Sequence, residues 1–205
     1  MSLKETRNKT RMMVTTALFA AIIVALQFVP IPPIGGIPIT LSLVPIVLAA
    51  VLYGAVQGAI LGALMGIAIV IQILTRPDLA GPLTMTMYTF SPVMTIVLCI
   101  VKSTAAGYLS GVVAKLLNKF NRTVSVVAAS AICPIVNTGL FLAGVFAIFD
   151  KPLSEWVSAN TQHTSLMAFM LIVILLGNFL PELVLNVVVS PVIIRVSEIV
   201  KKNNK

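Results

Sequence analysis

The chain has 205 residues, of which 59% are hydrophobic and only 10% are charged. An average soluble domain has about 25% charged residues, so this composition excludes an ordinary soluble enzyme and a secreted domain. The formal net charge is +8 at pH 7, but the basic residues flank apolar segments, as they do on the cytoplasmic side of membrane proteins. We therefore expect an integral membrane protein. Its positive charge is expected to interact with the lipid bilayer, and no nucleic-acid partner is expected.

The first half of the chain predicts three membrane-spanning helices. About 20 apolar residues in a helix cross about 30 Å of hydrocarbon, and the first such segment covers about residues 12–29. It ends at PIPPIGGIP, residues 30–38, where four prolines and two glycines exclude a continuous helix. A second, shorter span is expected over about residues 39–53 and a third over 54–74, and the short connection between them predicts a tight helical hairpin.

The second half of the chain predicts three more helices separated by polar loops. Residues 75–90 are expected to form the first of these loops. Ser91 and Pro92 are typical of a helix start, as an N-cap followed by proline at the first helical position. The predicted helices cover about residues 91–117, 123–149 and 166 onward, with a second polar loop at about 150–165. Pro181 and Pro191 are expected to kink the last helix.

The distribution of Lys and Arg predicts the orientation, because positive residues near spans are retained in the cytoplasm. One side would hold most of the basic residues: Lys4, Arg7, Lys9, Arg11, Lys115, Lys119, Arg122, Arg195, Lys201, Lys202 and Lys205. The other side would hold only Arg76 and Lys151. Both termini are therefore expected in the cytoplasm, and an even number of spans likewise places them on the same side. The expected fold is an all-α membrane protein, with residues 1–205 forming a single domain of six transmembrane helices.

Two charged residues lie deep inside apolar segments, Lys102 in the fourth predicted helix and Glu182 in the sixth. Each costs about 2.5–3.5 kcal/mol at the bilayer centre on insertion scales, so a charge at this depth indicates a functional site. A purely structural pair between Lys102 and Glu182 is the alternative, and both interpretations can hold together.

The polar residues of the last three predicted helices lie at similar depths. At about 1.5 Å per helical residue, Lys102, Asn137 and Asn178 are all about 16–18 Å below the surface. Glu182 lies one turn from Asn178 on the same helix face. Such a cluster is what a pocket for a small polar solute requires. The alternative for each asparagine is an interhelical hydrogen bond, worth under about 2 kcal/mol.

Small residues recur at every fourth position of two predicted helices. The first helix carries Ala17, Ala21 and Ala25, and the third carries Gly54, Gly58, Gly62 and Gly66. Both patterns predict flat faces that allow close contact between helices. We interpret the glycine series as internal packing, whereas the alanine face could equally meet another subunit.

Motifs for catalysis or metal binding are missing from the sequence. It contains no HExxH, GxSxG or Walker A motif and no metal-spaced Cys/His cluster, and its one histidine, His163, falls in a predicted loop. We therefore expect no enzyme activity, no cofactor and no metal, and no ATP-driven transport by this chain alone.

The order of several segments resembles the S components of energy-coupling factor (ECF) vitamin transporters, six-helix membrane proteins that capture a vitamin outside the cell. The segments are TRMMVTTALFAAIIVALQF, ITLSLVPIVLAAVLYGAVQGAILGALMG, VKSTAAGYLSG, VNTGLFLAGVFAIF and NFLPELVLNVVV. The resemblance covers nearly the whole chain. It implies a prokaryotic plasma-membrane protein that works with a membrane coupling subunit, EcfT, and a pair of cytosolic ATPases.

The resemblance also implies roles for particular residues. The alanine face of Ala17, Ala21 and Ala25 would dock on the coupling subunit. The loop after the first helix would gate the pocket, with its prolines and glycines as the gate: Pro32, Pro33, Gly35 and Gly36. Substrate would contact the outer halves of the last three helices, and the candidate ligand-binding residues are Lys102, Asn137, Asn178, Glu182, Tyr88 and Phe141.

Among the subfamilies, a cation in the fourth helix followed by Asn-Thr in the fifth is most similar to the pantothenate-specific type. Lys102 would then pair with the vitamin's carboxylate, although arginine would be expected at this position. If Glu182 neutralises Lys102, the pocket suits a neutral vitamin. Riboflavin, pyridoxine, hydroxymethylpyrimidine and folate stay open as substrates. A self-sufficient carrier or channel and, last, an intramembrane enzyme with Glu182 as base are the alternatives outside the family.

Overall fold

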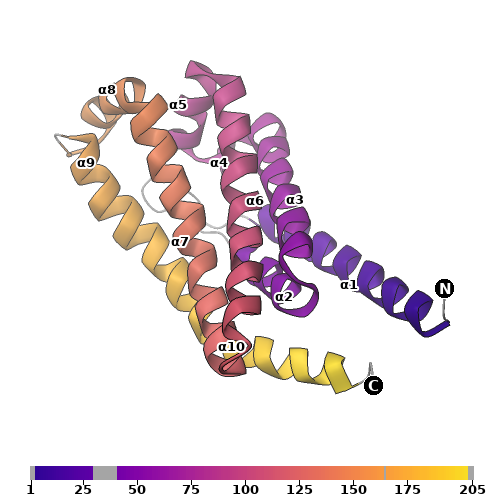
Figure 1. The fold of residues 1–205 in the computed structure, drawn as a ribbon. Helices are drawn as coiled ribbons and strands as arrows, with labels where there is room; N and C mark the ends of the chain where they lie inside the picture. Colours follow the sequence, from indigo (N-terminus) through magenta and orange to yellow (C-terminus); the bar gives the residue numbers. More distant parts are fainter. Residues whose placement is uncertain (1–2, 30–40, 164, 203–205) are drawn as a thin grey trace.

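The computed structural model describes residues 3–29, 41–163 and 165–202, and within these ranges the chain is helical and contains no strand (Figure 1). The four residues predicted to gate the pocket, Pro32, Pro33, Gly35 and Gly36, lie outside the described residues. The helices are α1 (Leu3–Gln27), α2 (Leu43–Tyr53), α3 (Ala55–Thr75), α4 (Pro77–Ala80), α5 (Pro82–Phe90), α6 (Pro92–Leu117), α7 (Arg122–Ile148), α8 (Asp150–Asn160), α9 (Leu166–Phe169), the π-helix η1 (Met170–Phe179) and α10 (Leu180–Lys202).

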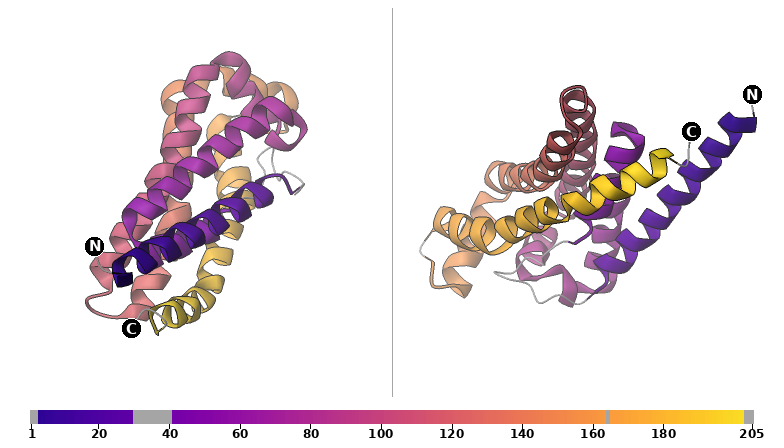
Figure 2. Two further views of the ribbon diagram at one scale, coloured as in Figure 1. Left: turned by 90° about the vertical axis from the view of Figure 1, so that its right-hand side faces the viewer. Right: turned by 90° about the horizontal axis from the view of Figure 1, so that it is seen from below.

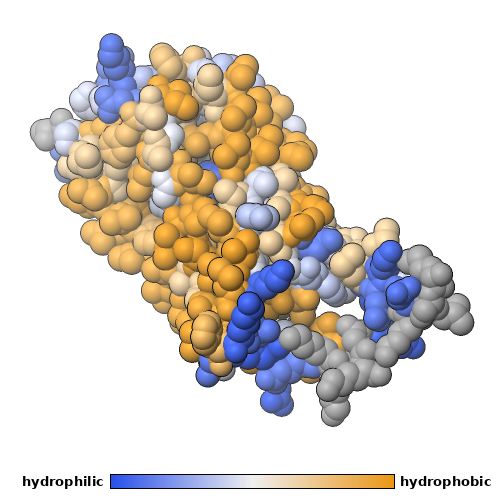
Figure 3. Space-filling model, viewed as in Figure 1, coloured by the Kyte–Doolittle hydropathy of each residue, from blue (hydrophilic) through white to orange (hydrophobic). Residues whose placement is uncertain are grey.

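Five helical segments of the described chain are long and apolar enough to cross a membrane. They are α1, α3, α6, α7 and the continuous helix formed by α9, η1 and α10. The second predicted span is observed as α2, an apolar helix of 11 residues. At about 1.5 Å per residue it is about 16 Å long, about half of the hydrocarbon thickness. Hydrophobic side chains cover much of the viewed surface, and hydrophilic ones gather toward its two ends (Figure 3).

Three boundaries predicted from the sequence were wrong. The first helix begins at Leu3 and not near Met12, and the predicted loop at 75–90 is folded into α4 and α5. The second predicted loop, 150–165, contains α8. Both segments were predicted as polar loops between apolar spans. Proline is favoured at the first position of a helix, and it opens both α4 and α5.

Local sequence explains where several helices begin and end. Gly54 (φ 95°) separates α2 from α3, and Gly81 (φ 82°) separates α4 from α5. These backbone angles are open to glycine but strained for other residues. Asn121 caps α7, because its side-chain oxygen accepts hydrogen bonds from the backbone N–H groups of Thr123 and Val124 at 2.8 and 3.3 Å.

The most extensive helix contact is between α3 and α6, and it is built on glycine. A Cβ atom added to Gly58 would lie 2.3 Å from the backbone oxygen of Gly107, and one added to Gly62 would lie 2.2 Å from that of Ser103. Gly66 similarly faces the backbone of Ile100 at 2.6 Å. Since a side chain at these positions would collide with backbone, the glycines allow the two helices to touch, as the interpretation of internal packing predicted.

The first helix is placed differently from the others. It crosses the bundle at an angle, and its N-terminal part extends beyond the other helices (Figures 1 and 2). Its inward side chains, such as Phe19 and Ile23, join the core, while Ala17, Ala21 and Ala25 are exposed. The alanine face therefore has no covering helix in the described part of the chain.

The last membrane-spanning helix departs from regular α geometry. Residues Met170–Phe179 form a π-helix that ends two residues before Pro181, which has no N–H for a bond to the preceding turn. Such π segments often occur at functional sites. Pro191 lies inside α10, and this helix changes direction along its length (Figure 1), consistent with the predicted kink.

Candidate functional site

A cavity lies among α3, α5, α6, α7 and the last helix, next to the end of α1. Five of the six predicted ligand-binding residues line it: Lys102, Asn137, Phe141, Asn178 and Glu182. Asn137, Asn178 and Glu182 are 4%, 5% and 2% exposed. The three residues predicted to lie in one layer, Lys102, Asn137 and Asn178, thus line the same cavity.

Tyr88, the sixth predicted residue, is placed elsewhere. It is partly buried on α5 and packs against the cluster of Ile73, Ala80 and Cys99. It is not among the residues that line the cavity. The helical fold of 82–90, which the sequence analysis took as loop, turns Met87 toward the cavity instead.

Lys102 brings a cation to the cavity wall. Its side chain is partly buried, and its Nζ atom lies 5.2 Å from the centre of the Phe141 ring. A cation within about 6 Å of an aromatic face is attracted by the ring's electron density. Phe141 follows Asn137 by one helical turn on α7, so Phe141 and the amide face the cavity together.

The last helix supplies a carboxylate and an amide at the junction of η1 and α10. Asn178 is near the end of η1 and Glu182 is in the first turn of α10, and both line the cavity. Asn186, one turn further, is fully buried but does not line it; its Nδ2 donates to the backbone oxygen of Glu182 at 2.8 Å. This bond supports the backbone of the helix face that carries Glu182.

Asn137 presents a buried acceptor in the cavity wall, its Oδ1 atom, which is without a hydrogen-bond partner among the described residues. Leaving a buried acceptor without a partner costs about 1–3 kcal/mol, so a ligand that donates to it gains a substantial interaction. Asn137 follows Pro134, which lies inside α7, by three residues.

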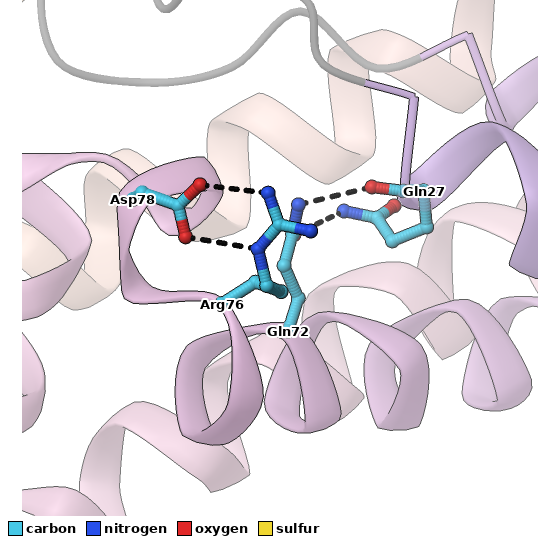
Figure 4. A network of polar contacts seen from close by, with 4 residues as sticks. All are labelled: Gln27, Gln72, Arg76 and Asp78. Atoms are coloured by element: carbon cyan, nitrogen blue, oxygen red, sulfur yellow. Dashed lines mark hydrogen bonds and ion pairs between the residues drawn. The ribbon is translucent and has the colours of Figure 1, made fainter.

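Two glutamines that were not predicted as site residues lie in the same wall, Gln27 at the end of α1 and Gln72 in the last turn of α3 (Figure 4). The Nε2 atom of Gln27 donates to Oε1 of Gln72 at 2.7 Å. The Nε2 atom of Gln72 donates to the backbone oxygen of Gln27 at 2.9 Å. The sequence feature that could have pointed to this pair is a polar amide side chain near the end of each of two apolar helices. Thr84, Thr95 and Thr138 also line the cavity.

An ion pair follows α3 directly. The guanidinium of Arg76 contacts the carboxylate of Asp78 through two atom pairs, Nε–Oδ1 at 3.1 Å and Nη2–Oδ2 at 2.9 Å (Figure 4). The hydrogen bond from Arg76 lowers the pKa of Asp78, and the same bond together with the negative charge raises the pKa of Arg76. Both side chains are exposed and neither lines the cavity, so this pair orders the connection between α3 and α4.

No metal-binding arrangement accompanies the cavity. The described residues contain no group of three or more His, Cys, Asp and Glu placed to hold a metal ion. Cys99 and Cys133 are buried free thiols, which behave as small hydrophobic side chains. The residues that line the cavity offer charge and hydrogen bonds for recognition of a ligand.

Residues 11–194 match the family model of the ECF transporter, substrate-specific component. The chain belongs to this family. As a substrate-specific component, it is a multi-pass membrane protein that binds a small molecule and works with the membrane and ATPase subunits of an ECF module. No curated protein matches the chain.

Proposed function

We propose that this substrate-specific component binds pantothenate outside the cell and delivers it through the ATP-driven ECF module. The observation that supports the proposal is the arrangement of Lys102, Asn137 and Asn178 around one buried cavity. Pantothenate has a carboxylate at one end, a central amide and two hydroxyl groups. A cation and several amides therefore match its chemistry group by group.

Each polar residue has a role in this proposal. Lys102 pairs with the carboxylate as a point charge, since a lysine lacks the two-pronged geometry of arginine. Asn137 accepts from a hydroxyl or amide N–H through its unpartnered Oδ1, and Asn178 bonds the amide or hydroxyl groups. Glu182, in the same wall, accepts from a hydroxyl. Burial strengthens these contacts because water competes for them less.

We assign six transmembrane helices to the protein, with α2 as the sixth and both termini in the cytoplasm of a prokaryotic cell. The clustering of Lys and Arg beside the chain ends supports this orientation. The exposed alanine face of α1, formed by Ala17, Ala21 and Ala25, docks on the coupling subunit EcfT, which a pair of cytosolic ATPases drives. The chain transports its substrate and does not alter it chemically.

A second candidate is a different vitamin. Lys102 and Glu182 line the same cavity, so their charges can balance each other and suit a neutral solute. Riboflavin, pyridoxine, hydroxymethylpyrimidine and folate are the vitamins to compare. A self-sufficient carrier or channel that uses the two charges as a relay is a candidate of another class.

Native mass spectrometry of the detergent-purified protein tests these candidates. We expect a co-purified ligand, and tight one-to-one binding when pantothenate is titrated against the vitamin panel. Binding of a vitamin that has no carboxylate would contradict the role of Lys102 as a carboxylate partner. Uptake of pantothenate by the purified chain alone in liposomes would contradict dependence on the ECF module.

A further inference from the structure

Two buried glutamines connect the end of α1 to the cavity. Gln27 is 8% exposed and Gln72 is 2% exposed, and both line the cavity that holds Lys102 and Asn137. Burying an amide between apolar helices is costly unless its donors and acceptors are hydrogen-bonded. If the two glutamines only joined α1 to α3, all of their buried polar atoms would be expected to have hydrogen-bond partners within the protein.

The hydrogen bonds between the two glutamines leave one acceptor over. Each Nε2 donates within the pair, to Oε1 of Gln72 at 2.7 Å and to the backbone oxygen of Gln27 at 2.9 Å. The Oε1 atom of Gln27 is buried and has no hydrogen-bond partner among the described residues. Gln72 thus satisfies one of the last backbone carbonyls of α1, which a helix leaves without an internal donor, and holds the Gln27 side chain in place.

We infer that Gln27 contacts the substrate: its Oε1 atom accepts a hydrogen bond from a hydroxyl group of the bound solute, and Gln72 positions it for that bond. The inference rests on the proposed function, because it adds a contact within the same cavity. It extends the site from the last three membrane-spanning helices to α1 and α3.

The cation and the unpartnered acceptors in the cavity wall define the substrate class. Lys102 favours an anionic group, whereas the unpartnered oxygens of Gln27 and Asn137 each require a donor. A small organic acid that carries hydroxyl or amide N–H groups meets all three. A site built to bond such a donor rejects analogues that lack it, because its own polar atom is then left buried without a partner. Gln27 is therefore a specificity-determining residue.

Gln57 offers a matched control. Like Gln72 it lies on α3 and faces α1, where Thr16 Oγ1 is 3.5 Å from its Oε1, but it does not line the cavity. A glutamine that only ties α1 to α3 would behave like Gln57. A glutamine that contacts substrate would respond to the chemistry of the ligand.

The test compares ligands as well as variants. Isothermal titration would measure pantothenate and its two monodeoxy analogues on wild type, Gln27→Met, Gln57→Met and the double variant Gln27→Met/Gln72→Met. The double variant removes both partners of the pair, which a folded protein tolerates better than the loss of one. We expect Gln27→Met and the double variant to bind pantothenate at least tenfold more weakly. We also expect one monodeoxy analogue to bind wild type and Gln27→Met equally, and Gln57→Met to match wild type throughout.

Other outcomes separate this inference from the proposed function. Unchanged pantothenate binding by folded Gln27→Met would overturn the inference and leave the function intact. Equal weakening of all three ligands would assign Gln27 to structure and overturn it as well. If wild type binds riboflavin, pyridoxine, hydroxymethylpyrimidine or folate instead, the pantothenate assignment fails. The inference then stands if Gln27→Met loses at least tenfold affinity for that vitamin and Gln57→Met does not, and it fails if both match wild type.

Discussion

The first and third helices carry small residues at the same four-residue spacing, yet the fold uses them in opposite ways. The glycines of α3 lie against the backbone of α6, whereas Ala17, Ala21 and Ala25 of α1 are exposed. The most apolar 18-residue window of α3 is 44% buried, and that of α1 is 17% buried. A stripe of small residues therefore shows that a helix can be approached closely, but not which helix approaches it.

The α3–α6 interface and the alanine face of α1 therefore have different roles. The α3–α6 interface is a tightly packed support in which one added methyl group would meet backbone atoms. The alanine face of α1 is open, and in the proposed function it meets another subunit. The cavity is lined by residues of both helices, Gln72 of α3 and Gln27 of α1.

The largest expected effect is on the α3–α6 interface. In Gly62→Ala the new Cβ would lie 2.2 Å from the backbone oxygen of Ser103, so the helices must separate. Overpacking of this kind costs about 1–3 kcal/mol, measurable as a lower thermal midpoint in detergent. Gly139→Ala is the control, because nothing lies within 4 Å of its added Cβ and helix propensity favours alanine. Equal stability of the two variants would contradict the tight interface.

The opposite behaviour is expected on α1. Ala21→Leu adds bulk to an exposed face, so the purified protein should fold and bind pantothenate normally. If this face docks on the coupling subunit, uptake by cells that express the whole transporter should fall at least tenfold. Ala143→Leu, a similar change on the exposed surface of α7, should leave uptake unchanged. Normal uptake with Ala21→Leu would show that the alanine face is lipid-facing only.

A change in the cavity should separate binding from docking. Lys102→Ala removes the cation near Phe141, and we expect at least tenfold weaker pantothenate binding, about 1.4 kcal/mol. Co-purification with the coupling subunit should be unaffected, the reverse of the Ala21 variant. Lys115→Ala, an exposed change outside the cavity, is the control in the same titration. Unchanged affinity in a folded Lys102 variant would assign this lysine to structure.

The smallest effect is expected at the end of α3. Arg76 lowers the pKa of Asp78, so the carboxylate stabilises the fold above its unfolded pKa of about 3.9, and this stabilisation is lost as the pH falls through the lower folded value. Both side chains are more than half exposed, and such pairs contribute little. Asp78→Asn should lower the thermal midpoint slightly at pH 7 and not at all once the pH has fallen below the lowered, folded pKa of Asp78. Glu155→Gln on α8 is the exposed control.

The sequence predicted the long helices well and the short ones poorly. Pro92 and Leu117 bound α6 as expected, because an N-cap serine, a first-turn proline and a polar run mark those ends. The helices α4, α5 and α8 were missed because they are short and amphipathic or open with proline, so their formation depends on packing. Leu153 and Val157 of α8, for example, are buried against other helices, which composition does not reveal.

Sequence alone predicted that this protein resides in a membrane, where its long helices run, and that Lys102, Asn137 and Asn178 lie close together. Those conclusions follow from composition and from the constant rise of a helix. Tertiary structure decided which small-residue stripe is covered, that Tyr88 does not line the cavity, and that Gln27 meets Gln72. The reason is that periodicity positions a residue along and around its own helix, whereas contacts between helices depend on their relative rotation and tilt.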